Sequence, residues 1–197
     1  MRIRPTVVLI AAMSFSVALA SAHDTGLKEK IRDVSPGKKF AIRISFDPAL
    51  DDGSGESISS DAIRSIDVVA LPGKTVVGNL AAGEGSIEGK VVWSQDSKWL
   101  AYAVGEGHRV TETSAYHWKG DKFEPLTTEE MSVDPGGDAR NQYIRPLRWA
   151  KPGTLVLSQF TIFYKGAGDS TIEFTVRFDD NGKFHVINRK KVRSKDE

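Results

Sequence analysis

Residues 93–102 read Trp-Ser-Gln-Asp-Ser-Lys-Trp-Leu-Ala-Tyr, a polar turn followed at once by an apolar run. Ser and Asp side chains bond the backbone within turns, and aromatic and aliphatic runs favour β-strands. The same order, a turn and then an apolar strand, occurs at residues 34–42 and 149–157. Ser35 and Ser94 are 59 positions apart, and Ala150 follows Ser94 by 56. Recurrence at intervals above ~50 residues predicts three repeated structural units.

A second pattern follows each of these turns: a strand, a tight turn with a lysine, and another strand. It occurs at residues 68–76, 116–123 and 177–184. Apolar residues also alternate with polar ones over 39–46 and 171–178. This period of two is typical of a strand with one buried face.

We therefore expect an all-β fold of three antiparallel four-stranded units, arranged as a propeller-like open array or a β-sandwich. The units fall at about residues 30–82, 83–130 and 140–193 of a single β-rich domain, residues 23–197. The expected exception is a short helix over Asp24–Arg32.

The run at residues 93–102 resembles the blade motif of bacterial periplasmic propellers of the TolB type. The resemblance implies that the Trp packs between neighbouring sheets, that Ser and Asp tie the turn, and that the apolar run is an inner strand. The other two units match less well, since Val34 replaces the Trp in the first and the third keeps only Trp149. Three units are fewer than the ~4 blades that close a propeller. The motif is structural and implies no catalytic residue.

The first 22 residues predict a secretory signal peptide. Arg2 and Arg4 form a positive start, residues 7–19 are largely apolar, and Ala20-Ser21-Ala22 supplies small residues for cleavage before His23. The expected location is periplasmic or extracellular, in a bacterium, with no integral membrane segment after cleavage.

Composition excludes several classes of site. The chain has 197 residues and no Cys, which excludes disulfides, thiolate metal sites and cysteine nucleophiles. The formal net charge is +1, so no overall field favours nucleic acid.

The acidic loop after residue 46 is the candidate metal site. Asp47, Asp51, Asp52 and Glu56 lie within ten residues that also hold two glycines. Calcium prefers clustered oxygen ligands on such turns, although the spacing is not that of an EF-hand and a solvated loop is the alternative. No cofactor is expected otherwise, and Ca²⁺ is the one ion considered.

Tyr143, Arg145, Arg148 and His108 are the candidate ligand-binding residues. The two arginines flank an aromatic ring and suit an anionic ligand, or they pair with neighbouring carboxylates. The expected working surface comprises the loops at one end of the units, residues 47–60, 105–113 and 134–143.

Catalytic patterns are weak. The chain has no Gly-x-Ser-x-Gly elbow and no paired histidine motif. We therefore expect an exported, non-catalytic binding or interaction protein, with a protein partner or self-association through edge strands. The alternative is a secreted hydrolase or glycan-active enzyme with a carboxylate-based site.

Overall fold

A computed structural model describes residues 26–51, 53, 57–83, 86–106, 109–127 and 129–192. The predicted signal peptide lies outside this part of the chain. The described residues form twelve strands and one short 3-10 helix, η1 (Tyr164–Gly166). The strands are β1 (Lys28–Arg32), β2 (Phe40–Phe46), β3 (Ile63–Ala70), β4 (Thr75–Ala82), β5 (Lys90–Trp93), β6 (Trp99–Glu106), β7 (Val110–Trp118), β8 (Phe123–Pro125), β9 (Ala139–Lys151), β10 (Thr154–Phe163), β11 (Asp169–Phe178) and β12 (Phe184–Val192).

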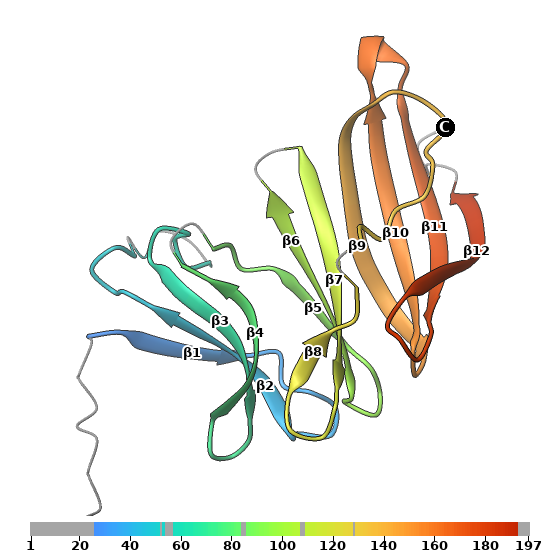
Figure 1. The fold of residues 1–197 in the computed structure, drawn as a ribbon. Coiled ribbons are helices and arrows are strands. Elements are labelled where there is room, and N and C mark those ends of the chain that lie inside the picture. The colour runs from blue at the N-terminus through green and yellow to red at the C-terminus, as the bar shows by residue number, and fades with distance from the viewer. Residues whose placement is uncertain are drawn as a thin grey trace, which may run out of the picture.

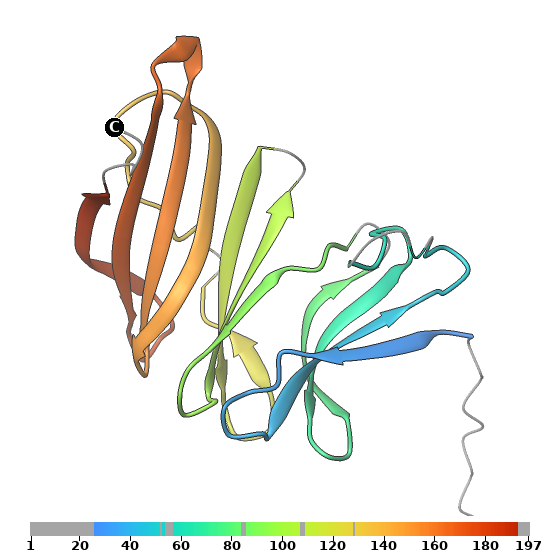
Figure 2. The same cartoon turned by 180° about the vertical axis from the view of Figure 1, so that it is seen from behind.

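The strands form three consecutive antiparallel meanders of four strands each. The first meander, β1 to β4, is a separate sheet, and β5 to β8 and β9 to β12 form the second and third meanders. A short parallel pairing of β7 with β9, at Val110 with Gln142 and Thr111 with Tyr143, joins the last two into one sheet. Figures 1 and 2 show the three meanders fanning out, close together at one end and splayed at the other. The predicted all-β fold of antiparallel four-stranded units is confirmed, and its arrangement is consistent with a propeller-like open array or a sandwich.

The prediction of a helix at Asp24–Arg32 is wrong over its described part. Residues 28–32 form β1, the edge strand that pairs with β2 from Lys28 with Phe46 to Arg32 with Ile42. Tertiary pairing decides here, because an isolated helix of nine residues is marginal in water.

The second meander is buried on both faces, which explains its continuous apolar run. Leu100 and Tyr102 of β6 belong to a core shared with the first meander, which includes Phe40 and Ile42. Ala101, between them on the opposite face, belongs to a second core shared with the third meander. Large side chains on one face and small ones on the other let two neighbouring sheets approach the same strand.

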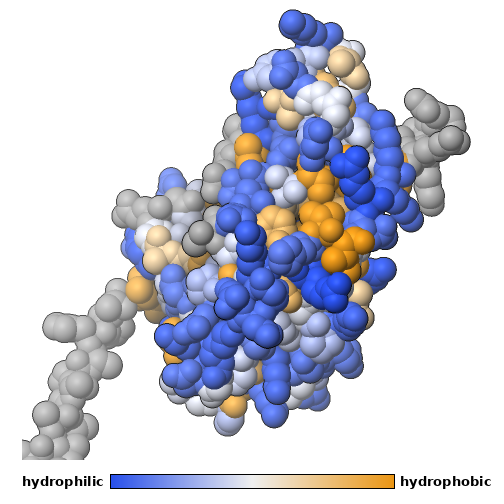
Figure 3. Space-filling model, turned by 45° about the vertical axis from the view of Figure 1, so that its right-hand side comes forward, coloured by the Kyte–Doolittle hydropathy of each residue, from blue (hydrophilic) through white to orange (hydrophobic). Residues whose placement is uncertain are grey.

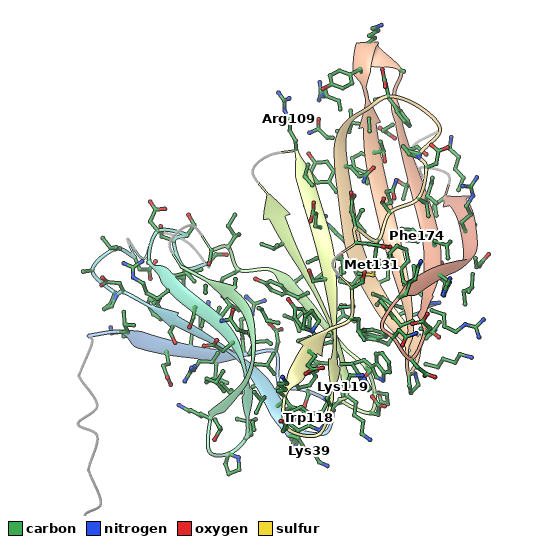
Figure 4. The ribbon with its side chains drawn as sticks, in the orientation of Figure 1. Lys39, Arg109, Trp118, Lys119, Met131 and Phe174 are labelled. Atoms are coloured by element: carbon green, nitrogen blue, oxygen red, sulfur yellow. The ribbon has the colours of Figure 1, made fainter. Side chains whose placement is uncertain are left out.

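The second core is closed by the segment between β8 and β9. Met131 of this segment is 1% exposed and packs in the cluster with Phe174 of β11. Figure 4 shows the two side chains at the same level of the third meander. The long connection therefore acts as an apolar cover for that sheet.

Tryptophans connect neighbouring meanders in a repeated way. The indole N–H of Trp93 donates to the Asp33 carbonyl at 2.7 Å, and that of Trp149 donates to the Val92 carbonyl at 3.0 Å. Each bond runs from the first strand of one meander to a backbone carbonyl in or just after the first strand of the meander before it. A buried indole N–H requires such a partner.

The turns carry the side-chain bonds that the motif predicted. The Ser94 hydroxyl accepts from the Trp99 N–H at 2.9 Å and donates to Asp96 at 2.6 Å. Ser35 accepts from the Phe40 N–H at 3.1 Å, so the first two turns share one arrangement. These local bonds replace backbone partners at each turn.

Candidate functional site

Two adjoining hollows lie on one face of the joined sheet. The first, about 500 Å³, is lined by Tyr143 and Arg145 of β9 and by Ser158, Phe160 and Ile162 of β10. Strand register explains the grouping, because Tyr143 is paired with Phe160 and Arg145 with Ser158. Paired residues of neighbouring strands point to the same face of a sheet.

The first hollow combines stacked rings with a cation. The rings of Tyr143 and Phe160 lie 6.1 Å apart at an interplanar angle of 21°. The Arg145 guanidinium carbon lies 5.9 Å from the centre of the Tyr143 ring, within the range of a cation–π contact. Such a surface offers a flat apolar wall, a hydroxyl from Ser158 and a positive charge to one ligand.

The second hollow, about 430 Å³, shares Arg145 with the first. Its other described lining residues are Glu88, Gly89, Lys90, Ala103, Gly105 and Thr111. Small side chains on β6 and β7 leave room beside β9. Arg145 thus lines both hollows and Lys90 lines the second, and neither has a carboxylate partner among the residues that the structure describes.

Glu88 is the carboxylate of this region, and it is already engaged. Its side chain is 6% exposed, accepts from the Ile58 N–H at 2.7 Å, and pairs with Arg32 and, at 3.5 Å, with Lys30. Burial opposes its ionisation, but the Ile58 N–H and the two cations outweigh it and hold the pKa of Glu88 below its ordinary value. Glu88 is therefore an anion that ties β1 and the loop before β3 to the start of β5.

Tyr102, a residue of the first core, lies near Glu88 and Gly89. Burial raises the pKa of Tyr102 to about 12, so the hydroxyl stays protonated. It donates to the Ile87 carbonyl at 2.8 Å, which satisfies a buried polar group beside the hollow.

The structure brings two of the four candidate ligand residues together. Tyr143 and Arg145 line the same hollow, whereas Arg148 lies further along β9 and is not among the lining residues. His108 lies outside the described residues. Figure 4 shows Arg109 just before the start of β7, where β7 pairs with β9. The Arg109 carbonyl accepts the Gln142 N–H at 2.9 Å.

Of the four candidate calcium ligands, Asp47 and Asp51 are described, and both already have partners within the protein. Asp47 accepts from the Ala49 N–H at 2.9 Å and lies 3.5 Å from Arg64. Asp51 accepts from the Ser59 N–H at 3.2 Å. Asp52 and Glu56 lie outside the described residues, so the calcium site remains a prediction.

Sequence reasoning missed the β10 wall of the first hollow and the lysine of the second. Ser158, Phe160 and Ile162 alternate with the buried Leu157, Gln159 and Thr161. Apolar residues occur on both faces of this strand, so its pattern alone does not mark one face as open. The residues of β10 that line the hollow can be identified only from the register in which β10 pairs with β9.

The described titratable groups show no carboxyl with a raised pKa. The shifted carboxyls, Glu88, Glu124 and Asp179, are all lowered. Burial against the Trp99 ring, at 3.9 Å between centroids, lowers the pKa of His117, with Lys119 adding to the effect. No group of three or more His, Asp or Glu side chains suited to a metal occurs in the described part of the chain.

Comparison with solved structures finds a weak likeness to a known protein. No protein family and no curated protein matches the chain. Among solved structures, that of TolB from Acinetobacter baumannii is similar over 81% of this chain and 32% of its own, with 13% identity and a TM-score of 0.37. This chain thus spans about a third of that protein. None of the described helical segments is long and apolar enough to cross a membrane. The chain bears a weak resemblance to the TolB-type β-propeller fold.

Proposed function

We propose that this chain is an exported binding protein that holds an anionic ligand carrying a flat or apolar group. The observation that carries the proposal is the first hollow, where the rings of Tyr143 and Phe160 lie beside the Arg145 cation. Lys90, facing the adjoining hollow, adds a second positive charge. Aromatic faces and a guanidinium suit one ligand that offers both a ring and an acidic group.

Binding is favoured over acid–base catalysis by the state of the nearby carboxylate. A general acid in a cleft needs a raised pKa, whereas the pKa of Glu88 is lowered by its bonds. A carboxylate held by the Ile58 N–H, Arg32 and Lys30 serves structure. The proposal includes a protein partner or self-association at the sheet edges, and secretion through the predicted signal peptide.

Three small fragments test the hollow: benzoate, benzyl alcohol and benzylamine. They share a ring and differ in charge, so we expect saturation-transfer NMR to rank them in that order on the purified protein. Tyr143→Ala abolishes the signal of all three, and Arg145→Gln removes the preference for benzoate.

Two variants of the third meander serve as controls, one on β9 and one in the turn after β10. Arg148→Gln and Tyr164→Ala alter an exposed arginine and an exposed tyrosine that do not line the hollow. Both should bind benzoate as the original chain does. Equal binding of benzoate and benzylamine, or an unchanged signal in Tyr143→Ala, contradicts the proposed site.

A further inference from the structure

The edge strand β12 has an unusual combination of exposure and charge. Seven of its nine residues are exposed, and it is the last strand of the sheet, pairing with β11 alone among the described residues. Its free edge therefore presents backbone N–H and C=O groups to solvent. Exposed edges of this length are templates for an added strand.

Positive charge covers both faces of this strand. Arg189, Lys190 and Lys191 are consecutive, and none has an ion pair with a carboxylate in the described part of the protein. Arg189 is opposite the core residue Phe174, and Lys190 is opposite Glu173 on the other face. Because successive residues alternate, a strand beside β12 meets cations on each of its faces.

Hydrophobic residues precede the basic ones. Val186 is 41% exposed and Ile187 is 45% exposed, next to the partly buried Phe184. By residue type, β12 therefore has an apolar first half and a basic second half. Figure 3 shows that hydrophobic residues are exposed between hydrophilic ones on the side of the molecule that is turned forward.

We propose that β12 binds an extended acidic segment of a partner protein by strand addition. Backbone hydrogen bonds to the free edge supply affinity, and carboxylates opposite residues 189–191 supply specificity. A second copy of this chain is disfavoured, because antiparallel pairing of two β12 strands over their full length places residues 189–191 of one opposite residues 185–187 of the other, and these include no carboxylate. The proposal refines the partner part of the proposed function and uses a surface separate from the Tyr143 hollow.

The probe follows from the register. An antiparallel strand facing residues 192 to 185 needs acids first and apolar residues last, which gives the peptide acetyl-Thr-Glu-Glu-Glu-Thr-Val-Val-Thr-amide. Matched peptides separate the causes of binding. One replaces the three Glu with Lys. Two others keep Glu and carry N-methyl groups at the odd or at the even residues, so that each blocks backbone bonding on one of the two edges.

We expect the acidic peptide to bind in fluorescence anisotropy, more weakly as salt rises, and to slow hydrogen exchange of β12 amides. The double variant Lys190→Glu/Lys191→Glu should lose roughly tenfold in affinity, since it reverses two cross-strand charge pairs. The control Lys151→Glu/Lys165→Glu changes the net charge equally at exposed positions outside β12 and should bind as the original chain does.

Each alternative gives a distinct result. No binding of the acidic peptide, or equal binding of the lysine peptide, overturns the proposal. If both N-methylated peptides bind as tightly as the unmodified acidic peptide, charge attraction without strand addition explains the binding, and this result also overturns the proposal. Sedimentation tests self-association of the protein alone. If the protein forms a dimer and the Lys190→Glu/Lys191→Glu variant changes the dimer's stability, the β12 edge binds a second copy and the proposal is overturned. Fragment binding at the Tyr143 hollow is measured separately, so either proposal can fail alone.

Discussion

Replacing Glu88 by Gln tests whether the carboxylate that links the first two meanders stabilises the fold. The change keeps the size of the side chain but removes its charge, and with it the ion pairs to Arg32 and Lys30. A hydrogen bond to a charged group contributes about 1.5–3 kcal/mol net. The Lys30 pair, at 3.5 Å with a 40% exposed lysine, adds less than about 1 kcal/mol.

We therefore expect Glu88→Gln to lower the free energy of unfolding by about 2–3 kcal/mol. For a protein of this size the melting temperature should fall by roughly 4–12 °C. Urea unfolding followed by tryptophan fluorescence measures the free energy, because Trp93 lies between the two meanders.

The matched control is Glu29→Gln. Glu29 also contacts two cations, Arg43 at 3.1 Å and Lys74 at 3.4 Å, but its side chain is 40% exposed. Exposed pairs contribute about 0–1 kcal/mol, so this variant should be nearly as stable as the original chain. Equal losses in the two variants would refute the argument that burial makes Glu88 important.

The same group gives a pH dependence with a fixed sign. The folded-state pKa of Glu88 lies below its ordinary value of 4.5. Its stabilisation is thus complete above that value and is lost as the pH falls through the lower, folded-state pKa. The stability difference between the original chain and Glu88→Gln should shrink in that acid range and stay constant above it.

Two further substitutions and one titration test other features of the fold. Trp149→Phe keeps a ring but removes the indole donor at 3.0 Å from a β5 carbonyl, so it should cost about 1–3 kcal/mol in urea unfolding. Gly182→Ala, at φ +81° with its new methyl 2.2 Å from a backbone oxygen, should destabilise more than Gly166→Ala, which has φ +69° and open space; equal losses would show that the close approach is relieved. The NMR titration of His117 should have a midpoint below 6.5, so its protonation opposes folding as the pH falls below that value; a midpoint at or above 6.5 contradicts its burial against the indole.

The turn-and-strand repeat was predictable because its signals are local. Ser94 and Asp96 bond the backbone within five residues of their own positions, so composition at fixed offsets suffices to predict the turn. The alternation of Phe40, Ile42 and Ile44 likewise reports one buried face directly. Both patterns can be recognised in the sequence without knowing which strands are neighbours.

The candidate site was only half predictable because it depends on pairing. Tyr143 and Arg145 were found as aromatic and basic residues close in sequence. Phe160 and Ser158 join them only through the β9–β10 register, which shifts at irregularities near Thr154 and Val156. A one-residue shift moves side chains to the opposite face, so residue spacing alone does not identify this wall.

The tryptophan bonds and the two shared cores make each meander dependent on its neighbour. The middle meander has two such neighbours, whereas the first and third have one each. Stability in a linear stack of this kind is a sum of intrinsic terms and nearest-neighbour terms. The outer meanders should therefore open first under mild denaturant, and the amides of β6 should be the last to exchange with solvent. The surfaces proposed for binding on β12 lie on an end of this stack, where local opening costs least.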